Sequence, residues 1–175
     1  MSSVLSLIDR FMRWLYGNKT TIDDMPSIDN TTEIPLMTEL QKIYSIAKES
    51  IGTHMTLDES VPISVGCAEA VSKVLWEAGL PIPAKGIPGT FDLLKWLETN
   101  LKEVDTYTVG AVIISATGTG NGRIRGHTGI CAQYGILSNE SQTGLLREQW
   151  DIASWTDYYG RYGGFPIRYF IPIEA

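Results

Sequence analysis

The chain has 175 residues, of which 43% are hydrophobic and 10% aromatic, and this is enough to build a domain with its own core. Its 14 basic and 20 acidic residues give a net charge of -6, a sign that argues against binding to nucleic-acid phosphates. Two cysteines are too few for a disulfide framework, and no paired CxxC or HxxxH spacing predicts a zinc site, so we expect no metal and no other cofactor.

Residues 1–35 are predicted to form an amphipathic helix and a polar linker, followed by a second domain at 36–175. Charges at Asp9, Arg10 and Arg13 interrupt the apolar residues of that helix, which argues against a secretory signal peptide. The helix could pack on its own domain, on a protein partner or on a membrane surface. The sequence contains no run of about 18 apolar residues, so no helix that crosses the bilayer is predicted.

Three helices are predicted in the first half of the second domain. Apolar residues recur at helical spacing over 36–52 and again from Cys67 to Ala78, where Gly79 provides a stop signal. A third helical pattern begins at Thr90, a candidate N-cap, and continues to Leu101.

Beyond Val104 the pattern changes to short β-rich runs separated by glycine and polar residues. The runs are TVGAVIIS, GHTGICAQ, YGILSNES and FPIRYFIPI. Helices followed by strands predict an α+β fold with the helices packed on a small antiparallel sheet. The glycine-rich stretch at 116–126 lacks the GKS or GKT ending of a phosphate loop and precedes no helix, so it is predicted to be a hairpin loop.

Cys67 is a candidate nucleophile because of its position at a predicted helix start. Unpaired backbone N–H groups and the positive end of the helix dipole favour a thiolate there. The amide of Cys67 could also help to hold a developing oxyanion. The alternative is that Cys67 is a small buried residue, which is the commoner reason for a single cysteine.

A cysteine nucleophile needs a base, and the chain contains only His54 and His127. His127 begins a predicted strand directly after the glycine-rich loop at 116–126. Its ring would therefore stand off the sheet edge, where the chain enters from that loop. His54 lies in a polar stretch and is interpreted as a surface residue. His127 could equally be a strand residue with a satisfied hydrogen bond.

A third polar residue is expected opposite His127 if GHTGICAQ and YGILSNES form a hairpin turning near Gln133 to Gly135. Asn139 and Glu140 both fall within the window that faces His127. Either could accept the Nδ1–H of the imidazole and fix its tautomer. Asn139 is the first choice, while a different register would select Glu140.

The segments GCAEAVSKVLWEAG, GAVIIS, GHTGI and ILSN, within 63–141, resemble the CHAP and NlpC families of papain-like cysteine peptidases and amidases. The resemblance implies a papain-like fold in which Cys67 is the nucleophile, His127 the base and Asn139 the third residue. It also implies acyl transfer on amide bonds in bacterial cell-wall peptides, without a metal. The C-terminal part is similar to phage-encoded cell-wall hydrolases, so such a protein would be made in the cytoplasm and delivered to the wall.

Other interpretations of the same residues stay open. The same chemistry could serve an interbacterial toxin, and a non-catalytic virion or scaffold protein could retain the fold. Cys131 alternates with apolar neighbours and is predicted to be a buried core thiol. A cluster of aromatic residues near the C-terminus could line a substrate groove or serve as core or lid; its members are Trp150, Trp155, Tyr158, Tyr159 and Tyr162.

Overall fold

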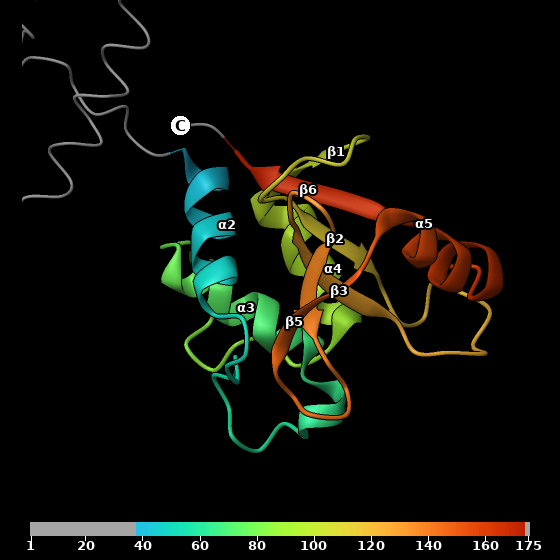
Figure 1. The fold of residues 1–175 in the computed structure, drawn as a ribbon, viewed down its shortest axis with the longest axis horizontal. Coiled ribbons are helices and arrows are strands. Elements are labelled where there is room, and N and C mark those ends of the chain that lie inside the picture. The colour runs from blue at the N-terminus through green and yellow to red at the C-terminus, as the bar shows by residue number, and fades with distance from the viewer. Residues whose placement is uncertain (1–37, 174–175) are drawn as a thin grey trace, which may run out of the picture. The chain divides into compact units, whose positions relative to one another are not determined.

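The computed structural model describes residues 38–173 (Figure 1). The N-terminal helix and linker predicted at 1–35, and the domain boundary that follows them, lie outside the described residues. Among the described helices, none combines the length and apolar character that crossing a bilayer requires.

The three predicted helices are present with slightly shorter bounds: α2 at Glu39–Glu49, α3 at Cys67–Glu77 and α4 at Thr90–Asn100. A capping box on Thr38 starts α2, since the Thr38 hydroxyl accepts from the Gln41 backbone and the Gln41 side chain accepts in return.

The prediction that Thr90 caps α4 is wrong. The N-cap is Gly89, and the Thr90 hydroxyl instead donates to Oγ1 of Thr117 at 3.1 Å. Because Thr117 lies in the loop just after β2, this tertiary contact competes with capping and links the start of α4 to the sheet.

A six-stranded antiparallel sheet follows, in the spatial order β1-β6-β2-β3-β4-β5. The strands are β1 Leu101–Val104, β2 Val112–Ser115, β3 His127–Cys131, β4 Ile136–Asn139, β5 Leu146–Trp150 and β6 Arg168–Pro172. The predicted α+β class is thereby confirmed, and the β3–β4 hairpin turns where the sequence indicated. The two edge strands, β1 and β5, were not predicted because their sequences LKEV and LREQW are largely charged and exposed.

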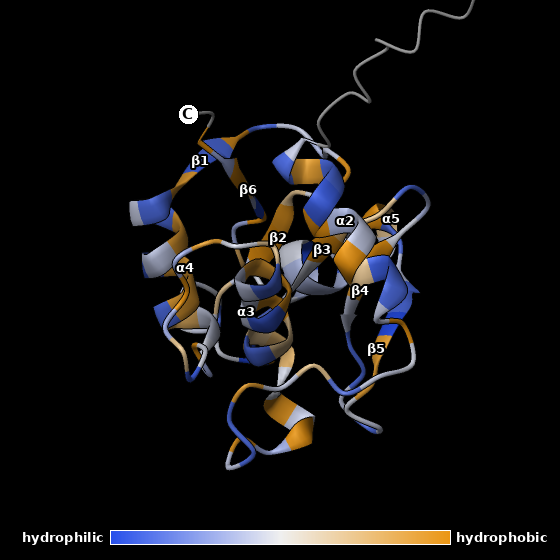
Figure 2. Ribbon diagram, turned by 90° about the vertical axis from the view of Figure 1, so that its left-hand side faces the viewer, coloured by the Kyte–Doolittle hydropathy of each residue, from blue (hydrophilic) through white to orange (hydrophobic). Residues whose placement is uncertain are grey.

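The sheet is apolar on both faces, and each face has its own cluster. Helices α2, α3 and α4 cover one face, where Val112, Ile114, Ile130 and Leu137 are buried. Figure 1 shows the C-terminal helical segment on the other side of the sheet from α2 and α3, and Figure 2 shows the strongly hydrophobic β2 lying behind α3. Alternation along the strands sends the intervening residues to the second face.

The second cluster contains Ile113, Cys131 and Ile136 from the sheet, together with Trp155 and Tyr159. Cys131 is a free thiol with no exposed surface, which confirms the prediction of a buried core cysteine. This arrangement leaves the odd-numbered positions of β3 facing the C-terminal aromatic residues.

Four of the five C-terminal aromatic residues lie on a short helix, α5 at Ile152–Trp155, which continues as a π-helix, η3 at Thr156–Tyr162, while Trp150 ends β5. A capping box between Asp151 and Ser154 starts α5. Trp155 is fully buried, and its Nε1–H donates to Oγ of Ser115 at 3.1 Å. At least this member of the aromatic cluster is therefore core.

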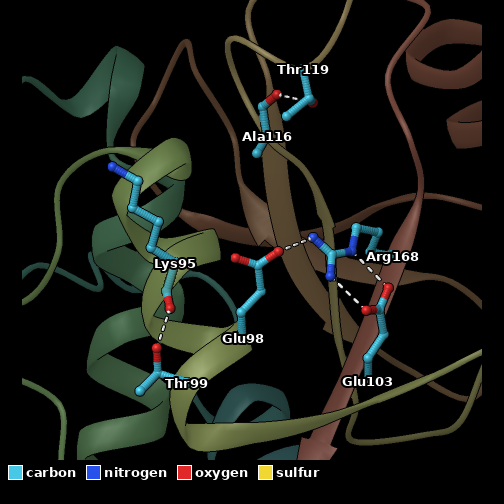
Figure 3. Close-up of polar contacts among 7 residues, drawn as sticks. All are labelled: Lys95, Glu98, Thr99, Glu103, Ala116, Thr119 and Arg168. Carbon is cyan, nitrogen blue, oxygen red and sulfur yellow. Dashed lines mark hydrogen bonds and ion pairs between the residues drawn. The ribbon is translucent and has the colours of Figure 1, made fainter.

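The sheet edge is tied to α4 by ion pairs of Arg168 (Figure 3). The Arg168 guanidinium contacts Glu98 of α4 at 2.5 Å and binds both carboxylate oxygens of Glu103 on β1, at 2.6 and 2.5 Å. This hydrogen-bonded pair lowers the pKa of the Glu103 carboxyl. Glu98 and Glu103 are about half exposed, so the network contributes little to stability and chiefly fixes how the strand and helix meet.

Candidate active site

Cys67 is the first residue of α3, and only Gly66 separates it from a short 3-10 turn, η2 at Ile63–Val65. The backbone N–H groups of Cys67, Ala68 and Thr128 lie close enough to the sulfur to lower its pKa, as expected at a helix N-terminus. Burial outweighs them, because the residue is only 8% exposed, and it raises the pKa of the thiol to about 11. In this arrangement Cys67 is a neutral thiol near pH 7.

His127 is the first residue of β3 and pairs across the sheet with Ser115. Its imidazole stacks against Trp155 at 5.4 Å and Tyr159 at 5.6 Å between ring centroids. Burial lowers the pKa of His127 to about 4, so the ring is neutral near pH 7. The Nε2 atom is buried and has no hydrogen-bond partner among the described residues, the Cys67 thiol included.

Cys67 and His127 line the same cavity, whose volume is about 290 Å³. Its walls come from segments far apart in the sequence: the turn before α3, the start of α4, the loop before β3 and the C-terminal π-helix. Lining side chains from these segments are Ser64, Thr90, Thr117, Arg125, Tyr158 and Tyr159. The fold thus gathers the predicted nucleophile and the predicted base at one cavity, with the backbone of Thr128 beside the sulfur.

Asn139 is the last residue of β4, and its side chain is turned toward the turn before Cys67. Its Nδ2–H donates to the carbonyl oxygen of Ile63 at 2.9 Å. A Cβ atom built on Gly66 would lie 3.7 Å from that Nδ2. The structure therefore joins Asn139 to the segment that carries the cysteine, and no hydrogen bond between Asn139 and His127 is present among the described residues. Its predicted role toward the imidazole stays a prediction.

Strand alternation explains this placement. The pairs Ile130 with Leu137 and Cys131 with Ile136 set the register of β3 and β4. Side chains at alternate positions of a strand point to the same face of the sheet. Asn139 therefore shares with Leu137 the face covered by helices. His127 shares with Cys131 the opposite face, which packs on the aromatic residues.

Glu140, the alternative third residue, is engaged in the turn between β4 and β5. Its carboxylate accepts a hydrogen bond from the Thr143 hydroxyl at 2.5 Å and lies 3.7 Å from Nε of Arg147. His54 is exposed, as predicted, and its Nδ1 lies 3.1 Å from the carbonyl oxygen of Gly144.

Two threonines that sequence reasoning did not connect with the candidate site hold the loop that leads into His127. The Thr117 backbone N–H donates to Oγ1 of Thr90 at 2.9 Å, and the Gly126 N–H donates to Oγ1 of Thr117 at the same distance. The Thr119 hydroxyl also donates to the carbonyl oxygen of Ala116, as drawn in Figure 3. Only the tertiary structure brings Thr90 and Thr117 together, so no local pattern could have identified this contact.

Glu69, in the first turn of α3, is a further buried polar residue that sequence reasoning missed. Its Oε2 accepts from the backbone N–H of Leu57 at 2.6 Å and of Asp58 at 3.2 Å, while Oε1 is buried without a partner among the described residues. These two hydrogen bonds connect the loop before η2, at Leu57 and Asp58, to the helix that begins with Cys67.

Among residues 38–173, no three His, Cys, Asp or Glu side chains are grouped so that they could hold a metal ion. Comparison with known proteins adds no assignment: no family model matches the chain, and no curated protein matches it significantly.

Proposed function

We propose that this chain is a cysteine hydrolase of the papain-like type that cleaves an amide bond in the peptide part of bacterial peptidoglycan, as a phage-derived endopeptidase or amidase. The observation that carries the proposal is the convergence of Cys67 and His127 on one cavity. The sequence resemblance implies this arrangement: a cysteine at the start of a helix, and a histidine on the antiparallel sheet against which that helix packs.

The proposed reaction begins with both groups neutral. His127 takes the proton from the Cys67 thiol as the sulfur attacks the amide carbon, so the thiolate exists only in the presence of substrate. Backbone N–H groups at the start of α3 stabilise the tetrahedral oxyanion, since the first N–H groups of a helix lack intrahelical partners. The imidazolium then protonates the leaving amine, and His127 activates the water that hydrolyses the thioester.

This sequence of steps requires the imidazole and the thiol to come within hydrogen-bond distance when substrate binds. Such contacts are often longer in a free enzyme than in its substrate complex. The unpartnered Nε2 of His127 is compatible with the proposal, because no described residue occupies the nitrogen that would have to accept the thiol proton. Asn139 supports the site by holding the turn that precedes Cys67.

Dye release from purified sacculi tests the proposal. The full chain should release dye, and Cys67→Ala and His127→Ala should reduce the rate to background. Cys131→Ala is the matched control, because it removes the other cysteine, which lies in the core and not at the cavity. Thermal unfolding of every variant establishes that the protein is folded. Equal release by Cys67→Ala and the parent chain would contradict the proposal.

A non-catalytic virion or scaffold protein that retains the fold is the second candidate. The observation that favours it is the electrostatic state of the pair, since burial alone keeps both the thiol and the imidazole uncharged. This candidate predicts that the folded parent chain releases no dye from sacculi of any wall type.

A further inference from the structure

The cavity that holds Cys67 and His127 has an unusual balance of charge. Among its lining side chains Arg125 is the only lysine or arginine, and no aspartate or glutamate is present. The chain as a whole carries a net charge of -6, because acidic residues outnumber basic ones. The cavity lining differs from this average, since it contains one arginine and no acidic residue. The remaining lining side chains include hydroxyls and aromatic rings, which cannot neutralise an arginine.

Arg125 is also without a counter-ion. The residue is exposed, and its guanidinium makes no ion pair with any residue in the part of the chain that the structure describes. Three other described arginines, Arg147, Arg161 and Arg168, do have acidic partners, such as Asp157 for Arg161 at 2.7 Å.

The backbone that carries Arg125 is firmly held. The next residue, Gly126, donates its N–H to Thr117 at 2.9 Å, and it packs so tightly that an added Cβ would lie 2.2 Å from the Thr117 nitrogen. The backbone next to Arg125, two residues before His127, is therefore held in place, and Arg125 lines the cavity from there. A guanidinium at the wall of a cavity can bind a carboxylate through paired, charge-assisted hydrogen bonds.

We infer that Arg125 binds a carboxylate group of the substrate, so that the cavity selects a peptide with a free carboxyl near the scissile amide over the same peptide with that carboxyl amidated. The inference rests on the proposed function for the identity of the peptide. It does not rest on that function for the binding itself, because the anion would be held whether or not the amide bond is cut.

The test separates binding from cleavage. Binding of synthetic cell-wall stem peptides to the full-length Cys67→Ala chain is measured by calorimetry, with each carboxyl in turn free or amidated, which identifies the recognised group. Amidation of one carboxyl should weaken binding about tenfold or more, as expected for loss of a charge-assisted hydrogen bond. Adding Arg125→Gln should abolish that difference by weakening only the free-acid peptide.

Arg123→Gln is the matched control, since Arg123 is an exposed arginine of the same loop that does not line the cavity. It should leave the preference for the free acid unchanged. The inference is overturned if no peptide binds, if amidation has no effect, or if the preference survives Arg125→Gln. If the preference is present but the parent chain cleaves no peptide, the hydrolase proposal fails and the carboxylate site stands.

Discussion

The carbonyl oxygen of Ile63 accepts a hydrogen bond of 2.9 Å from Nδ2 of Asn139. The same oxygen accepts the backbone N–H of Gly66 at 3.3 Å, so one acceptor joins the end of β4 to the turn that leads into Cys67. This relationship makes Asn139 a donor toward the cysteine segment, whereas the sequence suggested an acceptor toward the histidine.

Asn139→Asp distinguishes the two roles, because aspartate can accept the Nδ1–H of His127 but cannot donate to Ile63. We expect Asn139→Asp and Asn139→Ala each to lower the free energy of unfolding by about 1–3 kcal/mol and to reduce dye release. Gln133→Ala, at an exposed position of the β3–β4 turn, is the control and should change stability by about 0.5 kcal/mol or less. Normal activity in Asn139→Asp, with loss in Asn139→Ala, would instead favour the acceptor role.

The pH dependence of alkylation reports the state of the Cys67 thiol. Because burial raises its pKa to about 11, the rate of modification by iodoacetamide should keep rising through the alkaline range, with no plateau near neutrality. Mass spectrometry of the Cys67 peptide measures the rate, and Cys131, which has no exposed surface, should stay unmodified in the same samples. A plateau below about pH 7 would mean that a thiolate–imidazolium pair already exists in the free protein.

Acid should destabilise the protein through His127. Its pKa falls from 6.5 to about 4 on folding, so between these values the unfolded chain binds a proton that the folded chain does not. The stabilisation is complete above pH 6.5 and is lost as the pH falls toward 4. Urea unfolding at pH 7 and 4.5 should show that the parent loses about 2–3 kcal/mol more than His127→Gln. His54→Gln is the control for removal of one histidine.

An equal acid-induced loss in the parent and in His127→Gln would contradict the buried, neutral imidazole. The carboxylates contribute to acid unfolding in both proteins, and they cancel in the comparison.

The glycines that precede the two predicted catalytic residues should respond differently to alanine. A Cβ on Gly126 would lie 2.2 Å from the Thr117 nitrogen and 2.4 Å from the Ser115 oxygen, both backbone atoms. Gly126→Ala should therefore destabilise the fold by about 3 kcal/mol. A Cβ on Gly66 would meet nothing closer than 3.5 Å, so Gly66→Ala should cost no more than about 1 kcal/mol. Thermal unfolding measures both, and equal effects would refute the steric argument.

The sequence predicted those parts of the fold in which local pattern and burial agree. Helices α2, α3 and α4 have clear apolar stripes, and β2, β3 and β4 are apolar runs bounded by turn residues. The charged edge strands β1 and β5 were missed, because an edge strand needs few apolar residues and its pairing is decided by the neighbouring strand. The C-terminal helix and π-helix were missed because their aromatic residues suit a core, a groove or a lid equally well.

The sequence by itself determined that Cys67 begins a helix and that His127 begins a strand, since helix stops, glycines and apolar periods are local signals. Only the tertiary structure decided that both residues line one cavity with Arg125, that Asn139 turns toward Ile63, and that burial outweighs the helix N-terminus at the thiol. The physical reason is that strand register selects the face of each side chain, while desolvation depends on everything packed around a group. Neither quantity is encoded within a few residues of the positions concerned.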